Sequence, residues 1–445
     1  MTMNRTPARV VVLLLWLAPV PLLAQPEALP FDEALRQTMN RNPSLRAAQA
    51  DREAAAAAVS GAKAGWWPRV SVRESWQRGD QPVFVFSSLL ASRRFAADNF
   101  AIAALNQPDP IGYFHTLASV EQVVYDGGMT RASVGSATAG RTIADLGARE
   151  LELQLARDTA AAYGRLLSLQ ALRRALDASL EAGREDLARA TRRRDAGLAT
   201  DADVLALAVH TADLEQRVIQ ADGDLAAQRA ELNRLMGAPI DREYTAVEPP
   251  AVVVAPIRPL ATLFAEADAA RPEILRARAA EQLADHQRRG ARAAFLPTVA
   301  AQAALDVSGV RLTNRASSWI VGGEMRWTLS TGGAERAQLQ SATASRARAR
   351  AQAEDARAAV QVEIVSAVRR LQAARARQTV GRAAVEQARE SQRIVRDRYD
   401  AGLLPVNDVL RAAAAVLDAD VQRVDAVVDA FTSAAALERA VGRLP

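Results

Sequence analysis

The sequence contains two copies of one pattern, and the matching landmarks of the two copies are separated by identical numbers of residues. Pro43 and Pro68 are 25 residues apart, and so are Pro272 and Pro297. Two further intervals, of 69 and 40 residues, separate Gly128, Gly197 and Gly237 in the first copy and Gly333, Gly402 and Gly442 in the second. Short sequence motifs agree as well, since Asp-Val-Leu occurs at 203–205 and again at 408–410. A duplicated unit of this length indicates a pseudo-symmetric fold.

Each copy is predicted to contain one very long helix followed by a turn and a second helix. The stretches from Gly128 to Gly197 and from Gly333 to Gly402 contain no proline, and apolar residues recur in them at every third or fourth position. Each stretch can form one helix of roughly 65 residues, about 100 Å long at 1.5 Å per residue. Gly197 suits the left-handed position after a helix, and Thr200 with Asp203 has the spacing of a capping box. The second copy has Pro405 in place of Thr200, which is favourable in a first helical turn.

Two segments break the helical period and alternate apolar with polar residues instead, which indicates a β-hairpin in each copy. Of the 20 Phe, Trp and Tyr residues, 13 lie at 66–125 or 295–327, in or beside these hairpins. Strands with one apolar face and flanking aromatic residues are typical of a membrane β-barrel. The alternative is a soluble strand pair with a packed face. The residues predicted to form the aromatic belt are Trp66, Trp67, Trp76, Phe295, Trp319 and Trp327.

The predicted fold is mainly α with transmembrane β, built from two structural repeats that each combine a long helical hairpin with a two-stranded β-hairpin. Repeat 1 (25–237) is expected to have a helix at 31–66, strands at 68–78 and 116–126, and helices at 128–196 and 201–236. Repeat 2 (260–445) is expected to have a helix at 260–296, strands at 297–308 and 318–330, and helices at 333–401 and 406–442. A proline-rich linker joins them at 238–259, with room for a short strand at 251–255.

Composition excludes several classes of protein. Residues 1–24 have the positive start, apolar core and small-residue end of a secretory signal peptide. The chain has no cysteine, and therefore no disulfide and no lipid-anchor Cys, and no later stretch of 18 apolar residues predicts a transmembrane helix. The 51 acidic residues nearly balance the 56 basic ones, which are scattered, so nucleic acid is not an expected partner.

Four strands cannot close a barrel, and an open edge in lipid leaves backbone groups without hydrogen bonds. The sequence therefore predicts that several chains contribute strands to one barrel, with the helices continuing as a shared tube. The first hairpin is 24 residues longer than the second, and the extra piece, around 84–114, is expected to be a long external loop.

Taken together, these motifs resemble the TolC-type outer-membrane efflux family. The resemblance rests on the Asn-Pro-x-Leu opening at 42–45, the helix end at 292–297, the Asp-Gly-Gly strand exit at 126–128 and the Gly-x-x-x-x-x-Asp-Val-Leu tips. It implies a homotrimer with a 12-stranded barrel in the outer membrane of a Gram-negative bacterium, in contact with outer-membrane lipid, and a periplasmic tunnel of 12 helices. It also implies a passive duct that docks a periplasmic adaptor (membrane fusion) protein and an inner-membrane pump of RND or ABC type.

The resemblance also assigns residues. The adaptor would dock on the two tips, which are Gly197, Leu198, Ala199 and Thr200 in the first copy and Gly402, Leu403, Leu404 and Pro405 in the second. Tyr399 and Asp203 occupy the positions of a gate contact, although helix capping alone also explains Asp203. Asp408 takes the place of the family's narrowest acidic ring, although a favourable negative charge at a helix N-terminus alone also explains it. Leu404 replaces an arginine of a second gate link, and Arg411 stands where some members have another acid, so a weaker cation preference is expected.

Two other classes of protein fit the sequence less well. An enzyme is disfavoured because His115, His210 and His286 lie far apart and the sequence has no phosphate-binding loop, nucleophile elbow or paired metal motif. No cofactor or metal is expected. A periplasmic coiled-coil structural or adaptor protein would explain the helices but not the alternating, aromatic-flanked hairpins.

Overall fold

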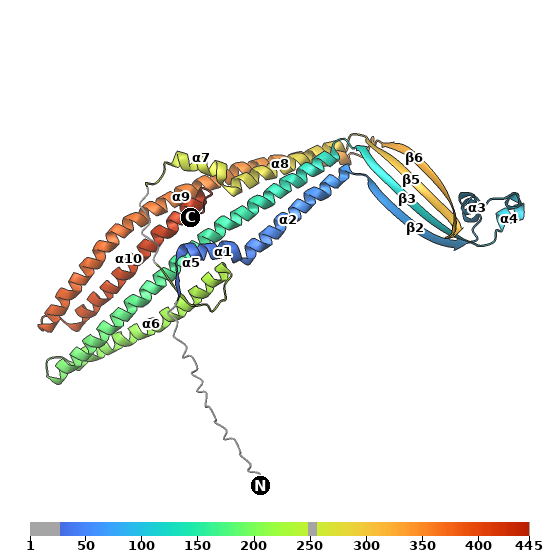
Figure 1. Cartoon of the computed structure of the whole chain (residues 1–445). Helices are drawn as coiled ribbons and strands as arrows, with labels where there is room; N and C mark the ends of the chain where they lie inside the picture. The colour runs from blue at the N-terminus through green and yellow to red at the C-terminus, as the bar shows by residue number, and fades with distance from the viewer. Residues whose placement is uncertain (1–26, 248–255, 445) are drawn as a thin grey trace, which may run out of the picture.

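A computed structural model describes residues 27–247 and 256–444, so the signal peptide predicted at 1–24 and the strand considered at 251–255 lie outside the described residues. The molecule is elongated, with a four-stranded sheet at one end and the tips of two helical hairpins at the other (Figure 1). In the two described ranges, no helix has the length and apolar character needed to span a membrane.

The long helical hairpins are α5 (Met129–Asp195) with α6 (Asp201–Met236), and α9 (Ala334–Asp400) with α10 (Val406–Ala440). Both first helices contain 67 residues. The glycines with positive φ occur as four equivalent pairs, at 127 and 332, 128 and 333, 197 and 402, and 237 and 442. The backbone therefore repeats the left-handed positions of one copy in the other, and the predicted duplication is confirmed.

The first helix of each repeat is broken, contrary to the single helices predicted at 31–66 and 260–296. Repeat 1 has α1 (Phe31–Arg41), α2 (Pro43–Lys63) and the short 3-10 helix η1 (Ala64–Trp66). Repeat 2 has α7 (Leu260–Ala270) and α8 (Pro272–Ala293). The break falls in each case on the residue before a proline, which the proline ring forces out of the helical region. Asn42 (φ −61°, ψ 127°) and Arg271 (φ −72°, ψ 117°) are accordingly extended.

The sheet is antiparallel, in the order β2 (Arg69–Gly79), β3 (Ile111–Tyr125), β5 (Thr298–Arg311) and β6 (Asn314–Arg326). The hairpins of the two repeats therefore pair with each other through β3 and β5, and β2 and β6 are the two edges. Four predicted bounds were wrong. The strand β3 begins five residues before 116, β5 continues to Arg311 rather than 308, and β6 both starts earlier, at Asn314, and ends earlier, at Arg326, than predicted. Residues 327–330 lie beyond the start of β5, so they have no neighbouring strand in this chain to extend β6.

The long external loop between β2 and β3 is not irregular throughout. It contains α3 (Pro82–Ala91), the 3-10 helix η2 (Ala97–Phe100) and α4 (Ile102–Asn106). Phe84 of α3 makes an edge-on contact with the ring of Tyr113, with 6.0 Å between ring centres, and a Cβ built on Gly79 would meet Phe84 at 3.7 Å. Gly79 and Tyr113 belong to the same face of the sheet, so α3 covers the outer end of that face.

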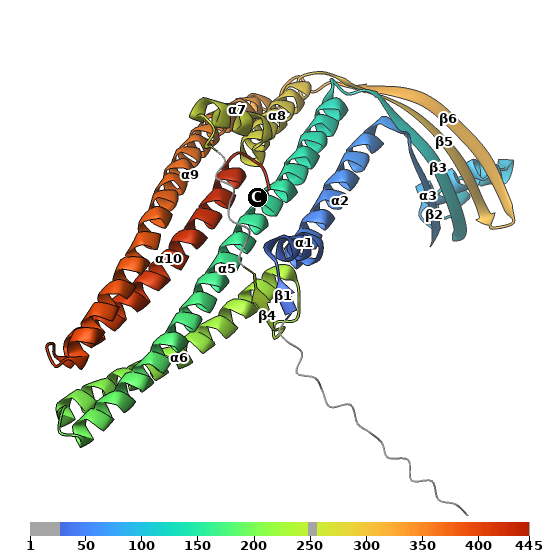
Figure 2. The same cartoon turned by 60° about the vertical axis from the view of Figure 1, so that its left-hand side comes forward.

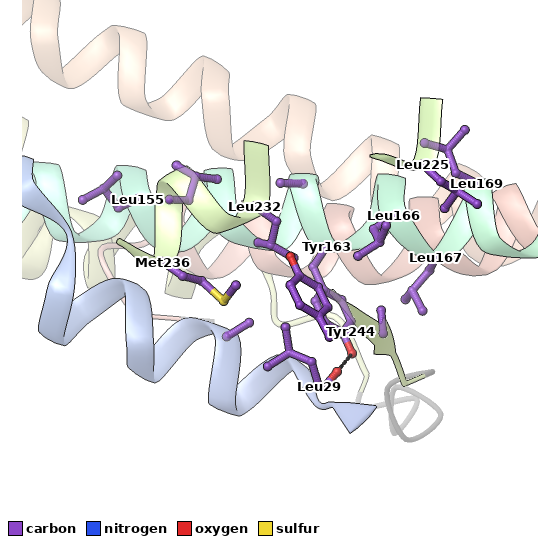
Figure 3. Close-up of a cluster of buried hydrophobic side chains, with 14 residues drawn as sticks. Leu29, Leu155, Tyr163, Leu166, Leu167, Leu169, Leu225, Leu232, Met236 and Tyr244 are labelled. Atoms are coloured by element: carbon purple, nitrogen blue, oxygen red, sulfur yellow. Dashed lines mark hydrogen bonds between the residues drawn. The ribbon is translucent and has the colours of Figure 1, made fainter. Parts of the chain in front are cut away.

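A small sheet lies midway along the helices, beside α1 (Figure 2). Its two parallel strands, β1 (Glu27–Leu29) and β4 (Tyr244–Ala246), were not predicted, and β4 falls in the region taken as a linker. Tyr163 of α5 is fully buried there, and its hydroxyl lies 2.7 Å from the Leu29 carbonyl (Figure 3) and 2.6 Å from the Val247 carbonyl, with one hydrogen to donate between them. The same hydroxyl accepts a hydrogen bond from the Val247 N–H at 3.0 Å. The surrounding apolar cluster joins α1, α5 and α6, so this midpoint anchors the first repeat.

Candidate functional site

The two hairpin tips have the same local geometry. Gly197 (φ 75°) and Gly402 (φ 76°) end the long helices in the left-handed conformation. The backbone N–H of Leu198 donates to the carbonyl of Arg193 (2.7 Å), and that of Leu403 donates to Arg398 (2.9 Å), which closes each helix with the same wide turn. The Leu198 and Leu403 side chains are 70% and 73% exposed, so each tip presents one leucine to its surroundings.

The other predicted tip residues support this arrangement. Ala199 and Leu404 are half-buried, and Thr200 and Pro405 are the N-caps of α6 and α10. Thr200 accepts a hydrogen bond from the Asp203 N–H (3.2 Å), and the Asp203 carboxylate accepts from the Thr200 N–H (3.1 Å) and hydroxyl (2.8 Å). The capping interpretation of Asp203 is therefore correct, whatever further role it has.

Tyr399 lies where the two hairpins meet. It packs against an apolar cluster that includes Ala190, Leu207 and Val406, and the guanidinium of Arg193 lies over its ring at 5.4 Å. Burial raises the pKa of Tyr399 above its usual value, and the negative charge of Asp203 raises it further. Tyr399 and Asp203 are thus within electrostatic reach of each other.

Three ion pairs join the two hairpins near their tips, and the sequence analysis missed them. Arg189 contacts the Asp400 carboxylate at 3.0 Å, and Arg193 contacts it at 3.4 Å and donates to the Asp400 carbonyl at 3.0 Å. Arg396 donates to Asp186 at 2.8 Å, and this pair is partly buried. Because these partners come from different repeats, no local pattern identifies them.

Asp408 and Arg411 lie on the same side of α10, one turn apart. The Arg411 Nη1 atom is 3.4 Å from Asp408 Oδ1, and Arg411 is otherwise exposed. The positive charge therefore partly neutralises the acid at the position assigned to the narrowest ring.

The strand register separates the large sheet into an apolar and a polar face. The apolar face is exposed and consists mainly of Val70, Val72 and Trp76 of β2, Phe114 and Val120 of β3, Leu305 and Val307 of β5, and Trp319, Val321 and Met325 of β6. The polar face includes Ser71, Arg73, Gln77, Glu121, Gln302, Asp306, Ser308 and Glu324. An exception on the apolar face is Glu74, which lies 3.0 Å from Arg315.

The predicted belt aromatics are all exposed, and they lie at two levels of the sheet. Trp66, Trp67, Phe295 and Trp327 lie where helices and strands meet, and the Trp327 Nε1 donates to the Phe295 carbonyl at 3.2 Å. Trp76 and Trp319 lie farther along β2 and β6. At ~3.3 Å per residue, the nine residues from Trp67 to Trp76 cover about 30 Å of strand.

The three histidines are on separate elements, β3, α6 and α8. His115 Nε2 is 2.6 Å from Asp306 Oδ2 on the polar face of the sheet. Within the described parts of the chain, no cluster of three or more His, Cys, Asp or Glu residues could hold a metal ion.

Comparison with known proteins gives a consistent result. The family model described as outer membrane efflux protein matches residues 34–238 and 263–443. The fold is similar to that of the outer membrane protein VceC from Vibrio cholerae, with 24% identity, a TM-score of 0.78, and 93% of this chain and 96% of that chain covered. It is also similar to a membrane protein from Pseudomonas aeruginosa (19% identity, TM-score 0.81, 93% of each chain) and to the Campylobacter jejuni CmeC outer membrane channel (16% identity, TM-score 0.79, 93% and 85%). No curated protein sequence matches the chain.

Proposed function

The chain belongs to the outer membrane efflux protein family, and from this premise we propose that it is the outer-membrane exit duct of a tripartite efflux or type I secretion system. The observation that carries the proposal is the four-stranded sheet, which has an exposed apolar face and two edges without partners. In lipid each unpaired backbone group costs several kcal/mol. The sheet therefore requires further strands from other copies of the chain.

A homotrimer supplies these strands. Three copies of the four-stranded sheet give a barrel of twelve strands, which is within the range of membrane barrels. Strands in such barrels are tilted by about 40°, so the two aromatic levels would be separated by roughly 23 Å, close to the ~25 Å apolar band of an outer-membrane barrel. The polar face then lines the lumen, and the helices form the periplasmic tunnel.

The hairpin tips are the proposed docking site for a periplasmic adaptor. They lie at the opposite end of the molecule from the sheet (Figure 1), and each exposes a leucine beside a rigid turn. An inner-membrane pump, of RND or ABC type, would supply the energy, and the duct itself would be passive. Docking would favour an open arrangement of the tips over a closed one.

The gate is assigned to the same region. Tyr399 and Asp203 belong to different hairpins, and the ion pairs of Asp400 and Asp186 join these hairpins directly. Moving the hairpins apart would break these contacts, so they favour the closed state. Asp408 would form the narrowest ring, with Arg411 weakening its attraction for cations.

The experiment that tests the function starts from fractionated cells. We expect the protein in the outer membrane as a heat-modifiable trimer that forms ion channels in planar bilayers. Replacing both Leu198 and Leu403 by aspartate should abolish export without changing these channels, whereas the same change at exposed Ile240 and Leu312, which lie far from the tips, should preserve export. Quantitative recovery with the soluble periplasm would favour the periplasmic coiled-coil adaptor instead.

Ion selectivity tests the lumen assignment separately. We expect weak cation selectivity in the unmodified channel and a stronger preference in Arg411→Gln. Strong cation selectivity in the unmodified channel that Asp408→Asn alone abolishes would contradict the role of Arg411.

A further inference from the structure

The helix α3 of the external loop lies across the outer end of the sheet, from one edge strand to the other. It follows β2 in the chain, its Phe84 contacts Tyr113 of β3, and the helix also contacts β5. Beyond its end, Arg93 donates a hydrogen bond to the Ser317 carbonyl of β6 at 2.8 Å. The 10 residues of α3 are about 15 Å long, and four strands spaced ~4.8 Å apart are about 14 Å wide. The helix is therefore long enough to cross all four strands.

Buried residues and one unusual backbone position hold α3 in this place. Val85 and Ser88 of α3 are buried, and so is Ser308 of β5, which accepts a hydrogen bond from the Tyr113 hydroxyl at 2.8 Å. Arg93 has a φ of 53°, a left-handed conformation that a residue other than glycine keeps only where its surroundings require it. The hydrogen bond of Arg93 to β6 is such a requirement. The helix is therefore attached to the sheet at both edges and in between.

The face of the sheet that α3 covers is the polar one. Tyr113 and Ser308, which lie beneath the helix, both belong to this face in the strand register. In the proposed trimer the polar face lines the lumen, and lipid lies on the opposite face of the barrel wall. The helix α3 is therefore inside the wall, at the end of the molecule farthest from the hairpin tips (Figure 1).

The side of α3 that points away from the sheet is apolar. Val83, Phe86 and Leu90 have the spacing of one helical face and are 74%, 37% and 58% exposed. Since Phe84, Val85 and Leu89 supply apolar residues to the other side, α3 is apolar nearly all round, as is typical of a helix that is buried. Lipid cannot cover the exposed side, because that side faces the lumen. Another protein surface must therefore cover it.

The size of the barrel indicates which surface this is. Twelve strands about 4.8 Å apart and tilted by about 40° close a barrel roughly 24 Å across between opposite backbones. An α-helix with its side chains is about 10–12 Å thick, so three helices side by side fill a circle of roughly 22–26 Å. Three copies of α3, one from each third of the wall, therefore meet at the axis of the barrel.

We propose that the three α3 helices of a trimer pack against one another through Val83, Phe86 and Leu90, and that they form a second barrier of the duct at its outer mouth. This inference rests on the proposed function, because it requires three copies around one axis. It goes further by placing a barrier at the opposite end of the molecule from the gate at the hairpin tips. A bulky cargo must then move α3 aside before it leaves the duct.

Cysteine cross-linking tests the packing, and the chain has no natural cysteine to interfere. Ser87 is exposed between Val83 and Leu90, and Ser87→Cys changes one atom. Oxidation of the full-length protein in outer membranes should give covalent dimers but no covalent trimers, because three thiols around one axis form one disulfide and leave one thiol free. The matched control is Ser71→Cys, on the polar face of the barrel wall, which should give at least about tenfold less dimer.

A bulky thiol reagent distinguishes this packing from an apolar side that awaits an external protein or an apolar cargo. Ser87→Cys should react with a polymer-linked maleimide at least about tenfold more slowly than Asp98→Cys, which is exposed in the same loop. Equal rates in the trimer would overturn the packing of the three helices.

The conductance of single open channels tests the barrier. Val83→Asp with Leu90→Asp places like charges around the axis, and it should raise the unitary conductance at least about twofold. Val83→Ile with Leu90→Met keeps the apolar side and should leave the conductance unchanged. An unchanged conductance in the charged variant would overturn the barrier.

Light scattering in detergent separates this inference from the proposed function. A trimer that forms channels, but in which Ser87→Cys gives no more dimer than Ser71→Cys, would overturn the inference and preserve the proposed function. A monomer without channels would overturn both.

Discussion

The ion pairs between the hairpin tips should hold the duct closed, and Asp400→Asn is the change that tests this most directly. Asp400 of α9 binds both Arg189 and Arg193 of α5, so one substitution weakens two of the three ion pairs that join the hairpins. The substitution keeps the size of the side chain and removes only its charge. The packing of Tyr399 should therefore remain.

The free energy by which these ion pairs favour the closed state can be estimated from the exposure of the charged groups. Asp400 is 38% exposed, and an ion pair of this kind contributes ~0.2–1 kcal/mol, so two pairs contribute about 0.5–2 kcal/mol for each protomer. If the three protomers open together, the closed state loses about 1.5–6 kcal/mol. Since 1.4 kcal/mol is a factor of ten in an equilibrium constant, the ratio of open to closed channels should rise at least roughly tenfold.

The assay is the open probability of single channels in planar bilayers, together with the susceptibility of cells to a large antibiotic that a closed duct excludes. Asp397→Asn is the matched control, because Asp397 forms an ion pair with Arg393 of its own helix at 2.9 Å and none with the described residues of the other hairpin. High salt should raise the open probability of the unmodified channel and change Asp400→Asn much less, since salt screens exposed charges. Equal open probabilities in Asp400→Asn and Asp397→Asn would refute the reasoning.

Three further outcomes are expected. Arg271→Met removes the fully buried cation beside Glu273 and Glu363, which keep Arg439 as a partner. The change should therefore cost up to about 3 kcal/mol, seen as a lower thermal midpoint by circular dichroism, whereas exposed Arg350→Met should change it little. Burial raises the pKa of Tyr163 and Tyr244 to about 12 from the usual 10, so their contribution to stability is complete below pH 10 and is lost as the pH rises towards 12. Tyrosinate absorbance and hydrogen exchange of β1 and β4 should report this loss together, and an ordinary titration near pH 10 would contradict it. Gly164→Ala should lower the thermal midpoint through contact with Val428, whereas Gly147→Ala, with open space around it, should raise stability by up to ~1 kcal/mol. Destabilisation by both changes would show that the space around Gly147 is needed.

The sequence predicted the parts of the fold that local chemistry determines. The tips were predictable because a glycine with positive φ, a capping residue and a proline-free helix all lie within a few residues of one another. The β-hairpins were predictable because one apolar face must alternate along each strand. The breaks at Asn42 and Arg271 could have been predicted in the same way, since each precedes a proline, but the helical period was extended across them.

The contacts that the sequence did not reveal are non-local. The strands β1 and β4 have three residues each, too few to show a period, and they pair across more than 200 residues. Tyr163 looks like any other apolar position of a long helix until its hydroxyl is seen between Leu29 and Val247. The Asp400 ion pairs likewise join residues about 200 positions apart.

The helix breaks at Asn42 and Arg271, here called the elbows, occupy equivalent positions in the two repeats. They show that a repeat predicts the position of a contact better than the residue that makes it. In repeat 1, Asn42 donates a hydrogen bond to the Leu235 carbonyl at 2.8 Å, at the end of α6. In repeat 2 the equivalent residue, Arg271, donates to the Arg439 carbonyl, at the end of α10. Both elbows therefore bind the free carbonyls of a helix end, but a short neutral amide does so in one case and a buried guanidinium in the other.

A guanidinium in place of an amide requires different neighbouring groups around the elbow. Arg271 is 1% exposed, so its charge must be balanced, and Glu273 (2.7 Å) and Glu363 (2.6 Å) lie beside it. At the equivalent positions of repeat 1 the residues are Ser44 and Asp158, and Ser44 uses its backbone N–H to bind the Asn42 side chain at 2.8 Å. The offset between the copies identifies the position of the elbow contact. It does not identify the ion cluster of Arg271 with Glu273 and Glu363, which follows only from burial. A buried amide needs hydrogen bonds, whereas a buried guanidinium needs acidic partners as well.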